Sequence, residues 1–305
     1  RGRGTMSALS ESLRAGREPA VQSVWARRFG VFWRSWETRI STLLLLVMIG
    51  VALVPTSVWP DTAFDSNLTL RHREPGLLMG TTDYLFGADA LGRDVFFRIL
   101  MGTKLTLLIA GLATLFATII GSAAGLCAAY FRGWVDMVVS RLVDIMLAFP
   151  ILLLVLALVA ALGQSVSSVI IVLALSGWAG YARVIRSATL SLVEREFVEA
   201  ARCTGARSGH ILLRHLLPNV ASPILVLSTL NLASFILTES SVSFLGLGPQ
   251  PPAVTWGALI GDGRNYMYDA WWATLFPGLA IILTVLAFNL VGDAMRDAFD
   301  PHTRQ

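Results

Sequence analysis

Long apolar stretches without a charged residue alternate with polar segments along this chain. Five such stretches occur, at residues 40–60, 105–131, 145–182, 215–238 and 270–292. A helix that crosses the hydrocarbon core of a bilayer needs about 20 mostly apolar residues, and each stretch is at least that long. Because only helices and closed barrels satisfy every backbone group inside a bilayer, the pattern predicts an all-α polytopic membrane protein.

The third stretch, residues 145–182, is too long to be one transmembrane helix. As a helix its 38 residues would extend about 57 Å, nearly twice the thickness of the hydrocarbon core. Gly163, Gln164 and the serines after them mark a turn between two shorter helices. We therefore expect six transmembrane helices, at residues 41–59, 105–130, 142–162, 167–187, 221–246 and 272–292.

The basic residues between these helices indicate their orientation. With six spans both termini lie on one side of the membrane, and that side carries 18 Lys and Arg residues against 6 on the other. Positively charged segments stay in the cytoplasm, so both termini are predicted to be cytoplasmic. The predicted division is a cytoplasmic segment at residues 1–40, a first span at 41–59, an outer loop at 60–104, a core of five spans at 105–293 and a cytoplasmic tail at 294–305.

The outer loop contains one more predicted element. Residues 92–101 combine Asp94 and Arg98, four residues apart, with an otherwise mostly apolar sequence. Opposite charges at that spacing share one face of a helix, which favours a short helix in the membrane interface just before the second span.

Composition agrees with the hydrophobic pattern. Of the 305 residues 55% are hydrophobic and 14% are charged, with a net charge of +4, whereas soluble proteins average about 25% charged residues. The chain is therefore not an ordinary soluble domain, and intrinsic disorder and nucleic-acid binding fall away as primary roles. Cys127 and Cys203 predict neither a disulfide framework nor a Cys-rich metal site.

The inner segment between the fourth and fifth spans, residues 191–219, has the most specific pattern. A helix over residues 192–204 would place an apolar arc opposite a charged arc. The apolar arc holds Val193, Phe197, Ala200, Ala201 and Thr204, and the charged arc holds Arg195, Glu196, Glu199 and Arg202. Gly205 then ends this helix, and Leu217-Pro218 ends a second short one. Such a helix either rests on lipid headgroups or presents its small alanines to another protein.

The spacing within this segment resembles the EAA loop of ABC importer permeases. Glu199-Ala200-Ala201 is followed after three residues by Gly205 and then, with His215 where many members have Ile, by Leu217-Pro218. Residues 86–94 look like the LGTDxxGRD box of dipeptide and oligopeptide permeases, with Phe and Ala replacing Leu and Thr. Residues 143–150, 243–252 and 292–301 also look like that peptide and nickel branch, and in particular like its C-type dipeptide permease subunit.

The resemblance implies the type I ABC importer permease fold, in a bacterial cytoplasmic (inner) membrane. In that family the EAA loop forms coupling helices that dock into a groove on the nucleotide-binding subunit. The ATPase-coupling residues implied here are Phe197, Glu199, Ala200, Ala201, Arg202, Gly205, Leu217 and Pro218. The implied partners are a homologous second permease subunit in a heterodimer, one or two ABC ATPase subunits, an extracytoplasmic substrate-binding protein and the lipid bilayer, with no nucleic acid.

The residues also argue against catalysis on this chain. Lys104 is the only lysine and follows Thr103, so no phosphate-binding loop ending in Gly-Lys-Ser/Thr is present. We therefore predict that the chain is not an enzyme and has no catalytic residue, that it binds no cofactor, and that ATP and Mg²⁺ bind to partner ATPase subunits. The histidines lack metal-ligand spacing, so no metal site is expected: His72, His210, His215 and His302.

Four residues are candidates for a pore or gate. Glu239 is the only acid well inside a predicted span, where an unpaired charge costs about 2.5–3.5 kcal/mol. It either faces the pore or is satisfied by neighbouring Ser and Thr hydroxyls. Asp144 lies at the inner interface one turn from Arg141, in a structural or a pore role. Gln250 and Pro251 belong to an irregular segment that either gates the pore mouth or contacts the binding protein.

We expect a permease subunit that forms half of the translocation pore of an ATP-driven importer for di- or oligopeptides. The same machinery for nickel chelates, glutathione or opines is the nearest alternative, because in this family the external binding protein largely selects the substrate. The alternative from another class is a self-sufficient secondary transporter or channel, but the inverted repeats that it predicts are not seen. An intramembrane enzyme has no supporting arrangement of residues.

Overall fold

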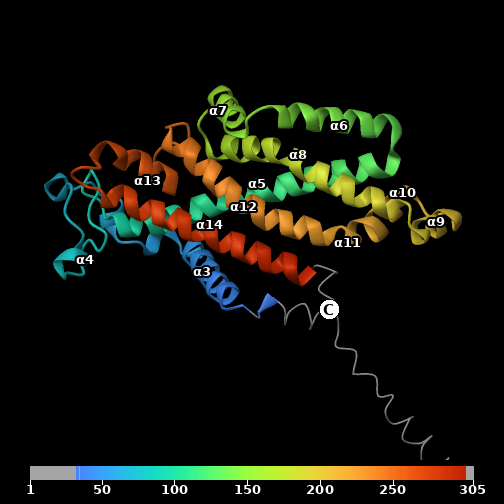
Figure 1. Ribbon diagram of the computed structural model, residues 1–305. Helices are drawn as coiled ribbons and strands as arrows, with labels where there is room; N and C mark the ends of the chain where they lie inside the picture. Colours follow the sequence, from blue (N-terminus) through green and yellow to red (C-terminus); the bar gives the residue numbers. More distant parts are fainter. Residues whose placement is uncertain (1–31, 34, 300–305) are drawn as a thin grey trace, which may run out of the picture.

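A computed structural model describes residues 32–33 and 35–299, and helices make up most of this part of the chain. Five helices in it are long and apolar enough to cross a membrane (Figure 1). They are α3 (Trp36–Leu53), α5 (Val95–Phe131), α8 (Val166–Val193), α12 (Ala221–Phe244) and α14 (Trp272–Phe299). They correspond to the first, second, fourth, fifth and sixth predicted spans. Most of the two predicted cytoplasmic terminal segments lies outside the described residues.

The third predicted span, residues 142–162, is a bent pair of helices. α6 (Gly133–Ala148) and α7 (Ile151–Leu162) meet at an angle of 93°. Pro150 breaks the helix because its ring excludes a helical conformation at Phe149, which is extended (φ −93°, ψ 140°). The described part of the chain thus has up to six spans if this bent pair is counted as one span, the third.

The turn predicted after α7 is present. Gly163 has a φ of +92°, a conformation that favours glycine. Ser165 then caps α8, since its hydroxyl oxygen accepts a hydrogen bond from the Ser168 N–H at 3.1 Å. The local turn chemistry therefore suffices to separate α7 from α8.

α5 is longer than the predicted second span, residues 105–130. Asp94 caps it, because its carboxylate accepts hydrogen bonds from the Phe96 and Phe97 N–H groups at 2.9 and 3.4 Å. From Val95 the helix continues for 37 residues, and no proline interrupts its hydrogen bonds. The separate interfacial helix predicted at residues 92–101 is therefore wrong, since residues 95–101 are the first turns of α5.

The pairing predicted between Asp94 and Arg98 is also wrong. Asp94 is occupied by the cap, and Arg98 instead forms an ion pair with Asp89, with its Nε 3.5 Å from Oδ2. Asp94 is the N-cap residue of α5, so its carboxylate bonds to the first N–H groups of the helix and not to the Arg98 side chain four residues later.

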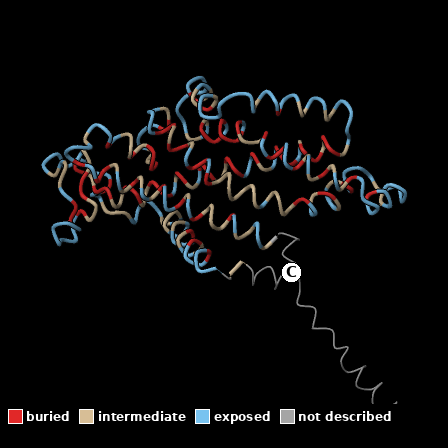
Figure 2. Tube along the Cα trace, in the orientation of Figure 1, coloured by how far each residue is buried: buried red, intermediate tan, exposed pale blue. Residues whose placement is uncertain are grey.

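The contact between α5 and α8 forms the centre of the bundle. Gly125 allows close approach there, since a Cβ on it would lie 2.6 Å from the Ala182 carbonyl oxygen. Small residues at such spacing are typical of packed membrane helices. Figure 2 shows buried segments concentrated where the helices face one another. The outer sides of α6 and α7 are exposed and apolar, with Trp134 71% and Leu153 63% exposed.

Short elements close the two ends of the bundle. They are η1 (Thr56–Val58), η2 (Asp61–Ala63), η3 (Leu68–Leu70), α4 (Gly76–Met79), α9 (Glu196–Cys203), α10 (Ser208–His210), the π-helix η4 (Ile211–Leu216), α11 (Leu217–Asn219), α13 (Trp256–Gly263) and η5 (Arg264–Tyr266). Figure 1 shows α4 and α13 at one end and α9 and α10 at the opposite end. We call these the α4 end and the α9 end.

Two tryptophans at the α4 end donate hydrogen bonds to backbone carbonyls of other segments. Trp256 is completely buried, and its indole N–H donates to the Ile99 carbonyl at 2.9 Å. The indole N–H of Trp272 donates to the Ala88 carbonyl at 3.0 Å. These bonds hold α13 and the start of α14 against α5 and the loop before it.

Candidate functional site

At the α9 end, the helix predicted over residues 192–204 is two helices. α8 ends at Val193 and α9 begins at Glu196, because the backbone at Arg195 is extended (φ −82°, ψ 146°). Between them Glu194 forms an ion pair of 2.8 Å with Arg132, the residue after α5. α9 is therefore a separate short helix and does not prolong α8.

Gly205 ends α9, as predicted. The Gly205 N–H donates to the Arg202 carbonyl at 2.9 Å, and the Ala206 N–H donates to the Ala201 carbonyl at 3.1 Å. This pair of bonds is a Schellman motif, which needs a left-handed residue, and the φ of Gly205 is +78°. A Cβ at Gly205 would meet nothing within 4 Å. The backbone conformation, and not packing, requires glycine here.

α9 packs on the chain with a different face from the predicted apolar arc. Val198, which lay between the two predicted arcs, is fully buried in one cluster with Ile211 and Leu216. Phe197 is 39% exposed and Ala200 is also exposed. Arg202 and Cys203 are exposed as well. We call the other exposed residues of α9 and of its C-terminal cap the α9 face: Glu196, Phe197, Glu199, Ala200 and Thr204.

Arg202 of α9 contacts another part of the chain, whereas Glu199 lies exposed on the α9 face. The Arg202 guanidinium lies 5.1 Å from the centre of the Tyr130 ring, and the Tyr130 hydroxyl donates to the Ser208 Oγ at 3.4 Å. Arg202 thus helps to hold α9 to the end of α5. Glu199 is exposed, and in the described part of the chain its carboxylate has no hydrogen-bond or ion-pair partner.

Leu217 and Pro218 do not stop the helical path, contrary to the prediction. η4 and α11 lead through Val220 directly into α12. Pro218 has no N–H to bond to the carbonyl of the preceding turn, and a wider π-turn lies just before it. The Val220 N–H donates to the Leu216 carbonyl at 3.1 Å. A nearly continuous helical segment therefore joins the region of α9 to α12.

Glu239 lies completely buried in α12. Its carboxylate accepts hydrogen bonds from the Ser243 and Ser240 hydroxyls at 2.7 and 3.5 Å. This is the arrangement in which neighbouring hydroxyls satisfy the acid. In this conformation the carboxylate does not face an open pore.

Asp144 pairs with a residue that the sequence did not indicate. Its Oδ1 lies 3.1 Å from a nitrogen of Arg183 on α8, whereas the basic residue nearest to it in the sequence is Arg141. Asp136 and Arg186 form a second, two-pronged ion pair between α6 and α8. Sequence reasoning missed both pairs because the partners lie far apart along the chain. The Asp144 pair is more than half exposed on both sides and stabilises the fold little.

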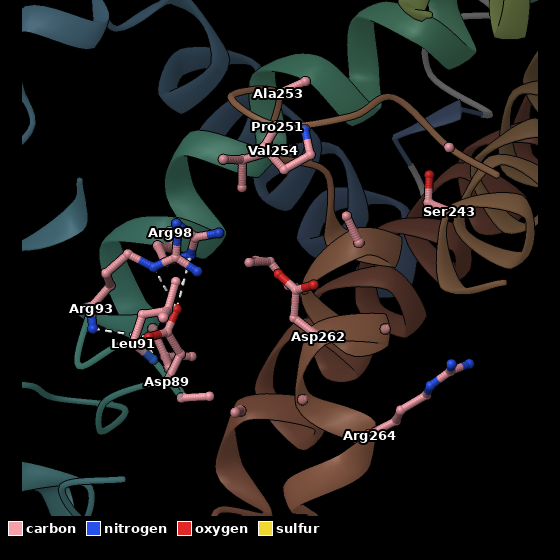
Figure 3. Close-up of a pocket in the computed structure, with 18 of the residues that line it drawn as sticks. Asp89, Leu91, Arg93, Arg98, Ser243, Pro251, Ala253, Val254, Asp262 and Arg264 are labelled. Atoms are coloured by element: carbon pink, nitrogen blue, oxygen red, sulfur yellow. Dashed lines mark hydrogen bonds and ion pairs between the residues drawn. The ribbon is translucent and has the colours of Figure 1, made fainter. Parts of the chain in front are cut away.

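Gln250 and Pro251 line a cavity of about 740 Å³ at the α4 end, which we call the α13 cavity. Gln250 is folded back on its own loop, since its amide donates to the Gly248 carbonyl at 3.0 Å. Five charged residues line the same space: Asp89, Arg93, Arg98, Asp262 and Arg264 (Figure 3). The gate role of Gln250 and Pro251 stays a prediction.

The long apolar helices define a multi-pass helical membrane protein. Residues 117–305 match the family described as binding-protein-dependent transport system inner membrane component, so the chain belongs to this family. It is 40% identical to the dipeptide transport system permease protein DppC of Alkalihalophilus pseudofirmus, over 86% of this chain and 83% of that protein. It is 37% identical to the glutathione transport system permease protein GsiD of Pectobacterium atrosepticum, over 96% of each chain.

The fold agrees with a solved transporter. The chain resembles a chain of the MetNI methionine ABC transporter in an inward-facing conformation, with a TM-score of 0.56 and 19% identity. The match covers 67% of this chain and 98% of that chain. The chain is thus a permease subunit of an ABC importer, which works with ATPase and substrate-binding partners. This result replaces the alternative of a self-sufficient secondary transporter or channel.

Proposed function

We propose that this chain forms half of the translocation pore of an importer for di- or oligopeptides. Two of its relatives are named as dipeptide and glutathione permeases, which supports small peptides as the substrate class. A homologous second permease subunit supplies the other half, and the exposed apolar sides of α6 and α7 offer it a large contact surface. The α9 end faces the cytoplasm of a bacterial cell, and the ATPase subunits bind ATP and Mg²⁺ there.

The observation that carries the coupling role is the α9 face. An uncovered phenylalanine, a small alanine and an unpaired glutamate lie together on a helix whose end is set by Gly205. Docking of an ATPase groove onto this face would bury Phe197 and give Glu199 a partner. Because η4 and α11 continue into α12, a displacement of α9 would pass to a membrane helix.

The test is association with the ATPase subunit of the same importer. We expect Glu199→Arg to weaken co-purification by about tenfold or more, because a reversed charge would enter the contact. We expect Gly205→Trp to do the same, because a side chain at positive φ disturbs the end of α9. Quantitative pull-down from detergent measures both effects.

Matched controls lie at the α4 end. Glu74 is exposed there, so Glu74→Arg makes the same charge change away from α9. Gly80 has a φ of +71° with open space around its Cα, so Gly80→Trp matches the strain at Gly205. Unchanged association of both α9 variants would exclude the docking role and favour a helix that rests on lipid headgroups.

The substrate is tested separately from the coupling. We expect a peptide to co-purify with the substrate-binding protein of this importer and to be taken up by reconstituted vesicles only with ATP. Glutathione, an opine or a nickel chelate in its place would replace peptides as the substrate class while leaving the machinery unchanged.

A further inference from the structure

The α13 cavity has the size of a small-molecule binding site. Its volume is about 740 Å³, and ligand pockets in proteins commonly measure about 300–1,000 Å³. The start of α5 and the loop before it form one wall, and α13 forms the facing wall (Figure 3). The segment 248–254 borders the space between them.

A buried arginine on the first wall has unused hydrogen-bonding capacity. Only 8% of the Arg98 side chain is exposed, and in the described chain its Nε has no hydrogen-bond partner. The nearby Asp89 is already occupied, because its Oδ2 accepts from the Arg93 Nε at 2.8 Å and its Oδ1 accepts from two backbone N–H groups. The ion pair between Arg98 and Asp89 is long, at 3.5 Å from Nε to Oδ2. An anion entering the cavity would give the buried guanidinium a hydrogen-bonded partner, so its binding would be favoured.

The facing wall carries the opposite charge. Figure 3 shows Asp262 of α13 directed across the cavity toward Arg98, with no bond drawn between them. Asp262 is open to solvent, and no ion pair to it is found in the described residues. The cavity walls still remove part of its hydration, which raises its pKa, while the charges of Arg98 and Arg93 act against the rise.

We propose that the α13 cavity binds a short zwitterionic solute, with its free carboxylate at Arg98 and its ammonium group at Asp262. A short peptide with both termini free has this chemistry. A solute with a single charge would leave one wall without a partner, so the two walls together select for two opposite charges. The inference rests on the proposed function, because it gives this chain a solute site of its own, apart from the binding protein.

The test is binding of three probes to the assembled importer in lipid nanodiscs, without ATP and without the binding protein. The probes are dialanine, N-acetyl-dialanine, which lacks the ammonium group, and dialanine amide, which lacks the carboxylate. Equilibrium dialysis gives the dissociation constants. We expect either blocked end to weaken binding by about tenfold, since a hydrogen bond to a charged group is lost.

Substitutions then assign each end of the solute to its wall. We expect Asp262→Asn to weaken binding of dialanine about tenfold and to leave N-acetyl-dialanine unchanged. We expect Arg98→Gln to weaken dialanine but to leave dialanine amide unchanged. Arg264→Gln is the control, because Arg264 lines the same cavity but lies over the Phe244 ring and points away from Arg98 (Figure 3).

Two results would overturn the inference. One is the absence of dialanine binding to the wild-type complex, and the other is an equal effect of Asp262→Asn on dialanine and N-acetyl-dialanine. The exposed position of Asp262 keeps the second result accessible even if Arg98→Gln fails to fold. Failure of ATP-driven uptake with the binding protein would instead count against the proposed function, so the two failures are distinguishable.

Discussion

The Asp94 carboxylate combines a helix cap with burial, since only 3% of the residue is exposed. Burial raises its pKa, and the hydrogen bonds from the Phe97 and Phe96 N–H groups act against that rise. The acid therefore stabilises the start of α5 through its oxygen atoms, while its negative charge is a disadvantage at that position.

Replacing Asp94 with asparagine keeps an oxygen atom that can cap α5 but removes the buried negative charge. Because the folded chain binds the Asp94 proton more tightly than the unfolded chain, wild-type stability falls as the pH rises above the ordinary value of about 3.9. We expect Asp94→Asn, which keeps an acceptor oxygen, to gain stability relative to wild type as the pH rises from about 4 to about 7. Thermal unfolding in detergent across this range measures the difference.

Alanine provides the comparison for the cap. Asp94→Ala loses the acceptor as well as the charge, so it is expected to be about 1 kcal/mol less stable than Asp94→Asn at every pH. A stability difference between wild type and Asp94→Asn that does not change with pH would contradict the raised pKa.

At the scale of helices, two glycines of α5 allow the axes of α5 and α8 to lie close together. Gly121 and Gly125 both face the backbone of α8, and any Cβ at these positions would enter it. The spacing of these glycines is visible in the sequence, but only the structure identifies their partner helix. Elsewhere on α5, Gly111 has open space around it and makes no such contact.

The contact predicts opposite effects for one substitution at two sites. We expect Gly125→Ala to destabilise the chain by about 1–3 kcal/mol, because the added methyl group would lie 2.6 Å from the Ala182 oxygen. Gly111→Ala is expected to be neutral or slightly stabilising, because alanine is the better helix former. Thermal unfolding in detergent compares them, and equal melting temperatures for the two variants would refute the close contact.

In the molecule as a whole, the distribution of charge and the fold together give an orientation. The segments at the α9 end belong to the side with 18 basic residues, which by the positive-inside rule is predicted to be cytoplasmic. Cys203, at the end of α9, is exposed, whereas Cys127 is only partly exposed. Labelling of the Cys203 thiol therefore shows on which side of the membrane the α9 end lies.

We expect a membrane-impermeant maleimide to label Cys203 in inside-out vesicles and not in intact cells, when the chain is expressed without its ATPase partner. Cys203→Ser gives the background from Cys127. Tyr268 is fully exposed at the α4 end, so Tyr268→Cys in the Cys203→Ser background should react in intact cells. Labelling of Cys203 from outside the cell would reverse the predicted topology.

The sequence by itself determined the class of protein, the approximate positions of the membrane helices and the end of α9. These features are local, because they depend on the length of an apolar stretch or on the backbone freedom of one residue such as Gly205. Pro150 also offered a local signal for the bend between α6 and α7, and the predicted straight span overlooked it.

Only the tertiary structure decided which side chains meet. The burial of Val198, the pairing of Asp136 with Arg186 and the facing charges of Arg98 and Asp262 join segments far apart in the sequence. Periodicity describes one helix at a time, whereas a buried face or an ion pair depends on the neighbour that the fold supplies. The α9 face and the α13 cavity are therefore properties of the packed bundle.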